Sequence, residues 1–472
     1  MSKSAVTTST WVADLAVAMH AAYRAPIPDA ALERAALQVF DGLACAAGAV
    51  DAPPVRAARK AVEGSGPQVA SVWFRPERVN LPDAVLLNGS ALRYLDFNDA
   101  FLGTGPSGHP SDNIPVALAV GEREGSSGRE VMAALVLGYE LYWRFRKHIY
   151  GPSDIASGWD GTSASGIVSA LIAGLLTGLD EEQLTQALAI GAAKGYGLKE
   201  LRRGSISTLK AAGNAMVARE GLLGALMARE GMTGPPLIFE GKSGLLAAFG
   251  LEASAELHDI LVAPPSWVIE NVAIKMYPSI GTSQAAIYGA ILIAEKHRPA
   301  PESIESITVH VPASLTTSEH ISIEQRKRPT TRETADHSMP FLIAAAIEDG
   351  ALSHAQFDDE RWLNPRTNAL MERVTVVPDE ELAALATNCY PARVEVVMSS
   401  GEHFVESVHP TPGSPDRPWG ADDVVGKFAG VQRVGLDAAG IQRIRDEIVR
   451  LPTAPDLSGL LAAVGAVPVT SS

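Results

Sequence analysis

Charged and amide side chains concentrate in two neighbouring stretches, residues 93–99 and 108–113. The first reads Arg-Tyr-Leu-Asp-Phe-Asn-Asp and the second Gly-His-Pro-Ser-Asp-Asn. Asp96 and His109 have the residue types of a general acid and a general base. Because leucine and phenylalanine residues interrupt the polar ones, we expect a loop anchored to a folded frame, where catalytic groups are common. The structural alternative is that these Asp and Asn side chains only cap helices and turns.

Four further polar segments supply acids, cations and a histidine. They are residues 158–162 (Gly-Trp-Asp-Gly-Thr), 201–210 (Leu-Arg-Arg-Gly-Ser-Ile-Ser-Thr-Leu-Lys), 274–279 (Ile-Lys-Met-Tyr-Pro-Ser) and 331–340 (Thr-Arg-Glu-Thr-Ala-Asp-His-Ser-Met-Pro). Where such a segment leads into a helix, the helix N-terminus and nearby cations favour binding of a carboxylate. Each segment also has a structural alternative, such as a surface ion pair, a solvated lysine or a helix cap. Because the segments come from both halves of the chain, we expect them to meet in a cleft between two domains.

Apolar spacing of about 3.6 residues predicts that both ends of the chain are helical. The predicted helices span residues 11–24, 29–49, 54–64, 83–94, 129–147, 162–178, 181–194 and 208–231, and later 421–432, 437–451 and 457–464. Ser127 and Asp180 are the expected N-caps of two of them.

The pattern changes near residue 265, where strand-like alternation begins. Strands are predicted at residues 306–311, 374–377, 393–398 and 403–408, with a hairpin turn at 399–402 and a helix over 338–347. The fold class is therefore mainly α. A large all-helical domain is predicted from residues 1–266 and 411–472, and a smaller α+β lid domain from residues 267–410.

Composition limits the classes of function. The 472 residues carry a net charge of −15 and have no long basic run, so nucleic acid and anionic membrane surfaces are not expected partners. The apolar runs are too short to span a bilayer, and the N-terminus lacks the apolar core of a signal peptide. Cys45 and Cys389 form neither a disulfide framework nor a cysteine-rich zinc site. We expect a soluble protein of the cytoplasm.

Three short motifs suggest a different chemistry, that of a serine acyl-enzyme of the penicillin-binding type. Residues 207–210 are an S-x-x-K, residues 111–113 an S-D-N, and residues 242–244 approximate K-T-G. However, S-D-N precedes S-x-x-K here, whereas it should follow, and Lys242 lies in a glycine-rich loop instead of on a strand. We therefore disfavour this alternative.

The polar motifs together resemble those of the MmgE/PrpD family, and most closely its 2-methylcitrate dehydratase branch. The motifs that carry the resemblance are residues 93–99, 109–113, 158–160, 201–204 leading to Lys210, 231–235, 239–241 and 331–338. They follow one another in order along most of the chain. The resemblance implies a homodimer, a cleft between the helical domain and the lid, and no metal or organic cofactor. It also implies a small polycarboxylate as substrate.

The resemblance further implies roles for particular residues. Its catalytic positions are Asp96, His109, Asp160, Lys210 and His337, and its substrate-binding positions are Arg203, Lys275, Tyr277, Arg332 and Ser338. The implied reaction is a dehydration. His109 or Asp96 removes a proton next to a carboxylate, and a protonated Lys210 or His337 assists the loss of hydroxide. The sequence leaves the choice of base and acid open.

Three positions depart from the family pattern. Ala100 stands where relatives often have Thr, Gly161 where His commonly follows Gly-Trp-Asp, and Phe341 where Tyr is common. Each departure removes a polar group that a bound polyacid could use, and one such hydrogen bond is worth roughly 1.5–3 kcal/mol. Two classes of function therefore remain. One is a cofactor-free hydro-lyase acting on a tricarboxylate such as 2-methylcitrate or citrate. The other is a relative with different chemistry: a cis-aconitate decarboxylase, an iminodisuccinate-type epimerase, or a paralogue that no longer catalyses.

Overall fold

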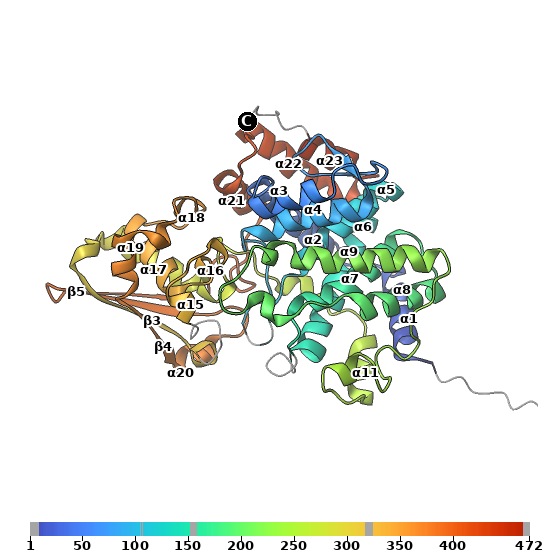
Figure 1. The fold of residues 1–472 in the computed structure, drawn as a ribbon, viewed down its shortest axis with the longest axis horizontal. Helices are drawn as coiled ribbons and strands as arrows, with labels where there is room; N and C mark the ends of the chain where they lie inside the picture. Colours follow the sequence, from blue (N-terminus) through green and yellow to red (C-terminus); the bar gives the residue numbers. More distant parts are fainter. Residues whose placement is uncertain (1–8, 104, 106, 152–157, 317–323, 466–472) are drawn as a thin grey trace, which may run out of the picture.

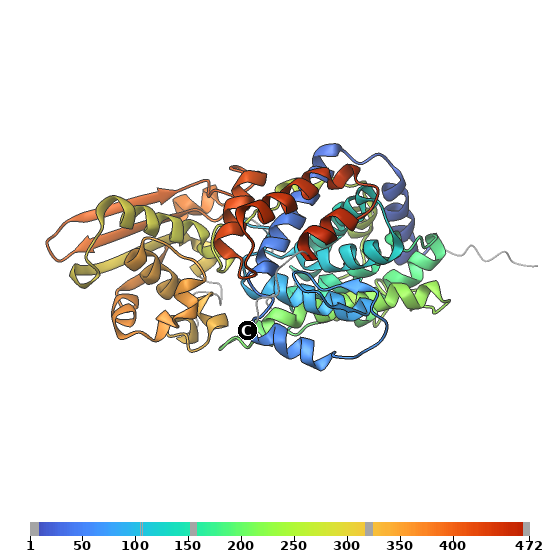
Figure 2. The ribbon, with the colours of Figure 1, turned by 90° about the horizontal axis from the view of Figure 1, so that it is seen from above.

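The computed structural model describes residues 9–103, 105, 107–151, 158–316 and 324–465. Figures 1 and 2 show a bundle of helices at one end of the molecule and a sheet with its own helices at the other. The helices of the bundle are α1 (Trp11–Arg24), α2 (Asp29–Ala47), α3 (Pro53–Ala61), α4 (Leu81–Tyr94), α5 (Ile114–Glu124), α6 (Gly128–Phe145), α7 (Ala164–Leu176), α8 (Glu181–Lys194), α9 (Leu209–Arg229), α10 (Leu245–Ala248), α11 (Ala255–Val262), α21 (Ala421–Val431), α22 (Ala438–Arg450) and α23 (Ser458–Gly465).

Helices from the two ends of the chain share one hydrophobic core. Its buried residues come from 12–274 and again from 424–464. Helix α2 packs against both α21 and α22, and the rings of Phe40 and Phe428 lie 5.7 Å apart at this contact. In Figure 1 the red C-terminal helices accordingly lie against the blue N-terminal ones.

Small residues let helices α7, α8 and α9 approach closely. A Cβ atom added at Gly221 of α9 would lie 2.1 Å from the carbonyl oxygen of Gly166 on α7, a distance no side chain tolerates. This close packing holds α9, whose first turn carries Lys210, against the bundle.

A four-stranded sheet forms the second core, whose buried residues lie within 277–408. Its strands are β3 (Ile304–Pro312), β4 (Val374–Asp379), β5 (Ala392–Met398) and β6 (His403–Val408), in the order β4-β3-β5-β6. Strands β3 and β4 are parallel, which requires the long crossover between them. The helices of this part are α12 (Gln284–His297), α13 (Ala313–Thr316), α15 (Glu324–Lys327), α16 (Arg332–Ala335), α17 (Met339–Asp349), α18 (Ala355–Asp358), α19 (Pro365–Met371) and α20 (Glu380–Leu385). Helices α12 and α17 pack against each other and against the sheet.

The expectation of a mainly α protein is confirmed, and so are the predicted hairpin β5–β6 and the N-caps Ser127 and Asp180. The prediction that the first part is all-helical is wrong in one detail. Residues Ala70–Ser71 (β1) and Arg78–Val79 (β2) form a small antiparallel sheet, and strands of two residues are too short to show a period. Helices α5 and α12 were not predicted. The division into two domains stays a prediction, although two separate cores exist. Among the described residues, no helix is both long and apolar enough to span a bilayer.

Candidate active site

Asp96 lies at the centre of a buried polar cluster, directly after helix α4 ends. Its backbone adopts the left-handed conformation, with φ of 50°, which aspartate tolerates better than most residues. This turn directs the carboxylate back toward the helix, where Arg93 Nη1 donates to Asp96 Oδ1 at 2.8 Å. Asp96 is only 1% exposed. A strained backbone that points a buried carboxylate at a cation is typical of a functional site.

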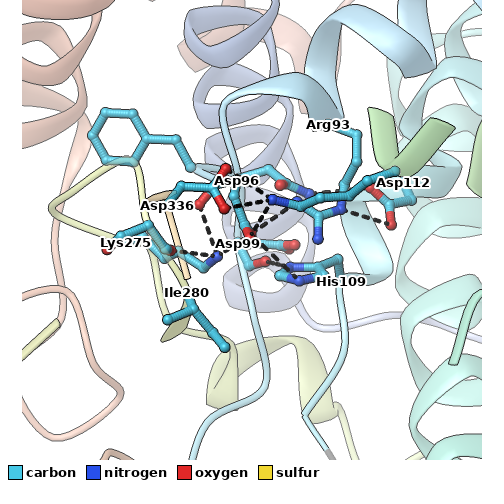
Figure 3. Close-up of polar contacts among 12 residues, drawn as sticks. Arg93, Asp96, Asp99, His109, Asp112, Lys275, Ile280 and Asp336 are labelled. Atoms are coloured by element: carbon cyan, nitrogen blue, oxygen red, sulfur yellow. Dashed lines mark hydrogen bonds and ion pairs between the residues drawn. The ribbon is translucent and has the colours of Figure 1, made fainter. Parts of the chain in front are cut away.

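Two lysines from distant segments also contact the Asp96 carboxylate. Lys275 Nζ lies 2.7 Å from Oδ1, and Lys210 Nζ lies 3.0 Å from Oδ2. An antiparallel bridge between Ala100 and Ala273 brings the Lys275 segment beside the Asp96 loop. Lys210 arrives from the first turn of α9. Figure 3 shows Arg93 and Lys275 converging on Asp96 from opposite sides.

The turn between α16 and α17 supplies Asp336 and His337. Lys210 Nζ donates to both oxygens of Asp336 at 2.9 Å. His337 Nδ1 is hydrogen-bonded to Asp336, and its Nε2 lies 3.5 Å from Asp96 Oδ2. Arg332 Nη1 donates to Asp336 Oδ2 and to the carbonyl of Tyr94, both at 3.2 Å. Residues of the sheet part therefore complete a cluster that begins in the helical bundle.

His109 lies at the edge of this cluster with a defined tautomer. Its Nδ1 lies 2.6 Å from the carbonyl oxygen of Asp99, so Nδ1 carries the proton and donates it. The other nitrogen, Nε2, then has a free lone pair and lies 3.9 Å from Asp96 Oδ1. Burial, together with the charges of Arg93 and Lys275, holds the pKa of His109 well below its usual value. His109 is thus a neutral imidazole whose unprotonated Nε2 can accept a proton.

Charge is unevenly distributed over the cluster. Burial opposes ionisation of Asp96, but the neighbouring cations, Arg93 first, hold its pKa well below the ordinary value. Burial lowers the pKa of Lys275 to about 8 and that of His337 to about 3. Burial also raises the pKa of Asp112 to about 7 and that of Asp99 to about 6. Four cations, Arg93, Lys210, Lys275 and Arg332, pair with the two carboxylates Asp96 and Asp336, and this excess of positive charge favours an anion.

Two arginine side chains at the site each have a nitrogen that donates no hydrogen bond to the described residues. Arg332 Nη2 and Arg93 Nε are buried and have no hydrogen-bond partner among the described residues. The Arg332 guanidinium is also held between rings, 4.5 Å from the centre of Tyr94 and 4.9 Å from that of Phe357. A buried donor without an acceptor is costly, so a bound ligand with acceptor oxygens would stabilise either nitrogen.

Asp96, Asp336 and His337 have ligand atoms within 4.8 Å of one another, which is close enough to hold a metal ion. However, the Lys210 ammonium contacts both of these carboxylates, at 3.0 and 2.9 Å. A divalent cation would have to displace it. The arrangement fits an internal ammonium better than a metal.

Not all residues singled out in the sequence join the cluster. Asp160 caps the short helix Gly161–Ser163 and pairs with Arg202 Nε at 2.9 Å. Arg203 is the next residue in the chain and is half-buried. Ser338 caps α17. Tyr277 packs in the core of the sheet part. The structure does bring together Asp96, His109, Lys210, Lys275, Arg332 and His337.

Four residues of the cluster were not assigned roles from the sequence, although all lie inside the quoted motifs. Arg93 and Asp336 pair with assigned residues, and the Asp99 carbonyl orients His109. Asp112 Oδ2 lies 4.0 Å from Arg93 Nε. Spacing offered a signal for Arg93 alone, because it lies three residues before Asp96 on a predicted helix.

The three departures from the family pattern lie in different surroundings. Ala100 belongs to the bridge that holds Lys275 in place. A Cβ atom added at Gly161 would lie 3.0 Å from the Arg146 guanidinium, so that arginine fills the space of a side chain. Phe341 is fully buried against Phe357 and Trp362.

The serine acyl-enzyme alternative has no geometric support. Ser207 is exposed, and Lys210 donates to Asp336 instead of to a serine hydroxyl. Ser111 accepts a hydrogen bond from Asn98 at 2.9 Å. Lys242 is exposed in its loop.

A buried set of cations, carboxylates and a neutral histidine at the junction of two cores is typical of an enzyme active site. Sequence models of the MmgE/PrpD N-terminal and C-terminal domains match residues 13–258 and 277–451. The chain therefore belongs to the MmgE/PrpD family.

Relatives with two named activities are similar to the chain. It is 26% identical to the cis-aconitate decarboxylase-like protein oryM of Aspergillus oryzae over 460 residues, which are 93% of this chain and 94% of that protein. Cis-aconitate decarboxylase of Homo sapiens is 24% identical over 76% of this chain and 74% of its own. The 2-methylcitrate dehydratase of Escherichia coli is 25% identical over 63% of this chain and 62% of its own. These relatives support a lyase and do not single out one branch.

Proposed function

We propose that this protein is a lyase that dehydrates a small tricarboxylate by removing a proton from a carbon next to a carboxylate. The observation that carries the proposal is the convergence of His109 and Lys275 on one oxygen, Asp96 Oδ1. A neutral imidazole Nε2 lies 3.9 Å from that oxygen and an ammonium lies 2.7 Å from it. A substrate bound beside this oxygen would have a base on one side and an acid on the other.

In the proposed reaction, His109 Nε2 accepts the proton from carbon. The electron pair of that C–H bond forms the new C=C bond as the C–O bond to the hydroxyl group breaks. Lys275, with a pKa of about 8, protonates the departing oxygen, so that water leaves. The proton on His109 then returns to Lys275 through solvent, and the enzyme regains its starting state.

His337 does not fit the expected role of proton donor, because its pKa of about 3 leaves the imidazole neutral. We assign it to holding Asp336 in position beside Lys210. Asp96 is a weaker candidate base than His109, because its pKa is held so low. Arg332 Nη2 and Arg93 Nε are the proposed donors to substrate carboxylates, and they stabilise the charge that builds up during proton removal.

Decarboxylation of cis-aconitate is the second candidate. The proteins named cis-aconitate decarboxylase from Aspergillus terreus match 92% of this chain, whereas the matches to named 2-methylcitrate dehydratases cover 63–68%. Decarboxylation would need a proton delivered to carbon, and the low pKa of His109 makes it a poor donor. The same cationic site would hold either substrate.

Near-ultraviolet absorbance separates the candidates, because a C=C bond conjugated to a carboxylate absorbs and a saturated hydroxy acid does not. Chelator-treated enzyme is mixed in turn with 2-methylcitrate, citrate and cis-aconitate. We expect a rise with a hydroxy acid. A fall with cis-aconitate together with release of carbon dioxide would instead establish decarboxylation. No change with any of the three would overturn the proposal. A homodimer is also proposed, and light scattering during size-exclusion chromatography tests it.

A further inference from the structure

A buried lysine from the C-terminal part of the chain lies directly behind the candidate site. Lys427 belongs to helix α21, and its side chain is 1% exposed. Its ammonium lies 2.5 Å from Asp41 Oδ1, a carboxylate on helix α2. The same ammonium lies 3.9 Å from the centre of the Phe97 ring. A lysine this deeply buried needs several partners to offset its desolvation.

The other two acceptors of Lys427 are backbone carbonyls of the site itself. Nζ lies 2.7 Å from the carbonyl oxygen of Phe97, the residue after Asp96, and 3.2 Å from the carbonyl oxygen of Lys275. An ammonium has three donors, and here each has one acceptor. Lys427 thus links the loop that carries Asp96 to the segment that carries Lys275.

The two linked segments have left-handed or irregular backbone at this point, so no regular ladder fixes their separation. The Ala100–Ala273 bridge is the nearby backbone contact between them. Lys427 ties them together nearer to the site, at the carbonyl groups of Phe97, which follows Asp96, and of Lys275 itself. Asp41 in turn anchors the ammonium to α2, in the centre of the helical core.

We propose that Lys427 is a positioning residue that sets the distance between the Asp96 carboxylate and the Lys275 ammonium. It acts through the two carbonyl groups and does not contact the substrate. The effect on turnover rests on the function proposed above, whereas the effect on Lys275 does not. This role also gives the C-terminal helices a part in catalysis, although they lie outside every polar motif of the sequence.

The experiment compares Lys427→Met with a matched control, Arg144→Met. Arg144 is equally a buried cation of the bundle that pairs with an acid, Glu140, and donates to two backbone carbonyls, those of Leu261 and Pro264. Neither carbonyl belongs to the site. Lys427→Gln, which keeps one amide donor group, serves as a second variant. The two readouts are the steady-state parameters and the titration of Lys275, followed by competitive amine labelling across pH and mass spectrometry of the peptide.

The direction in which the pKa of Lys275 moves shows whether Lys427 acts through its charge or through the position of Lys275. The charged groups that face Lys275 are Asp96, Arg93, Lys210 and the Lys427–Asp41 pair. Removing the charge of Lys427 alone would raise the pKa of Lys275, whereas loosening the Asp96 contact would lower it. In Lys427→Met we expect the midpoint to fall by about one pH unit. We also expect kcat to fall about 10- to 100-fold with KM changed far less.

Arg144→Met should be less stable than the wild type, but the titration midpoint of Lys275 should not change. In Lys427→Gln, both that midpoint and kcat should lie between the values of Lys427→Met and of the wild type. An unchanged or raised midpoint in folded Lys427→Met would overturn the inference. Failure of both Lys427 variants to fold, while Arg144→Met folds, would also overturn it in favour of a purely structural role. A wild type that turns over none of the polycarboxylates, but whose Lys275 midpoint still falls in Lys427→Met, would refute the proposed function and support the positioning role.

Discussion

Lys210 and Asp336 form a buried ion pair across the two cores of the molecule. The ammonium lies 2.9 Å from both carboxylate oxygens, and 126 residues separate the two positions along the chain. Both side chains are at most 1% exposed. This contact therefore links the helical bundle to the sheet part beside Asp96, whose Oδ2 lies 3.0 Å from the same ammonium.

Replacement of His109 by alanine should lower kcat by at least about 100-fold, because the substrate proton loses its base. The backbone of residue 109 remains held by Tyr142, whose hydroxyl accepts from its amide at 3.0 Å, so the fold should persist. Steady-state kinetics and circular dichroism measure the two effects. His403→Ala, at a half-exposed position on the sheet, is the matched control and should keep wild-type activity. Near-normal turnover by His109→Ala would remove it from the mechanism.

The dependence of kcat/KM on pH should show one limb, on the alkaline side. A base works in its unprotonated form, and the low pKa of His109 keeps it unprotonated through neutral and mildly acidic pH. An acid works in its protonated form, and Lys275 loses its proton as pH rises through about 8. Activity should thus be level around neutrality and decline above about pH 8.

Lys275→Arg tests this assignment, because an arginine does not titrate below about pH 12. Its residual activity should be low and should show no decline near pH 8. An acid limb near pH 6.5 in the wild type would show instead that His109 titrates as an ordinary histidine.

Asp96→Asn should lower the free energy of unfolding by about 3–5 kcal/mol, because it leaves buried cations without their shared carboxylate. Urea denaturation at pH 7 measures the loss. Asp51→Asn, at an exposed acid that pairs with Arg59 and Arg75, should change stability by no more than about 0.5 kcal/mol. A tricarboxylate ligand should restore part of the stability of Asp96→Asn. Equal decreases in the unfolding free energy of Asp96→Asn and Asp51→Asn would show that the buried ion pairs of Asp96 stabilise the fold no more than an exposed pair does.

Asp112 should make a pH-dependent contribution to stability. Its pKa is raised from the unfolded value to about 7 by burial, so the folded state binds the proton more tightly. The sign follows from linkage: stability due to this group is present at low pH and is lost as pH rises from about 4 to about 7. Asp112→Asn cannot titrate, so the variant does not lose this stability as pH rises. The unfolding free energy of the variant relative to the wild type should therefore increase over that window and stay level above it. A flat difference would contradict the raised pKa.

Chelation should leave activity unchanged, because the Lys210 ammonium lies between the carboxylates that would otherwise bind a metal. Purified enzyme dialysed against EDTA is assayed, and its metal content is measured by mass spectrometry. Stoichiometric metal together with loss of activity on chelation, restored by one divalent ion, would show that the ion displaces Lys210.

Local pattern was enough to predict most of the secondary structure. The helices of the bundle follow from apolar spacing, and the hairpin β5–β6 follows from alternation around Ser399–Glu402. Helix α5 was missed because it begins with Ile-Pro directly after a polar loop. The two-residue strands β1 and β2 form only because their partners meet in the folded chain. Residue type together with motif resemblance identified Asp96, His109, Lys210, Lys275 and His337 as candidates.

Tertiary structure alone decided how these side chains meet. The sequence could not show that Arg202 pairs with Asp160, because the two residues lie in separate segments that only folding brings together. It likewise could not show that Lys210 is neutralised by Asp336, or that Lys427 supports the site from helix α21. Each of these contacts joins segments more than 40 residues apart. Residue types along the chain therefore determined which chemistry is available, and long-range packing, which brings those residues into a shared, desolvated space, determined which groups are charged and which can react.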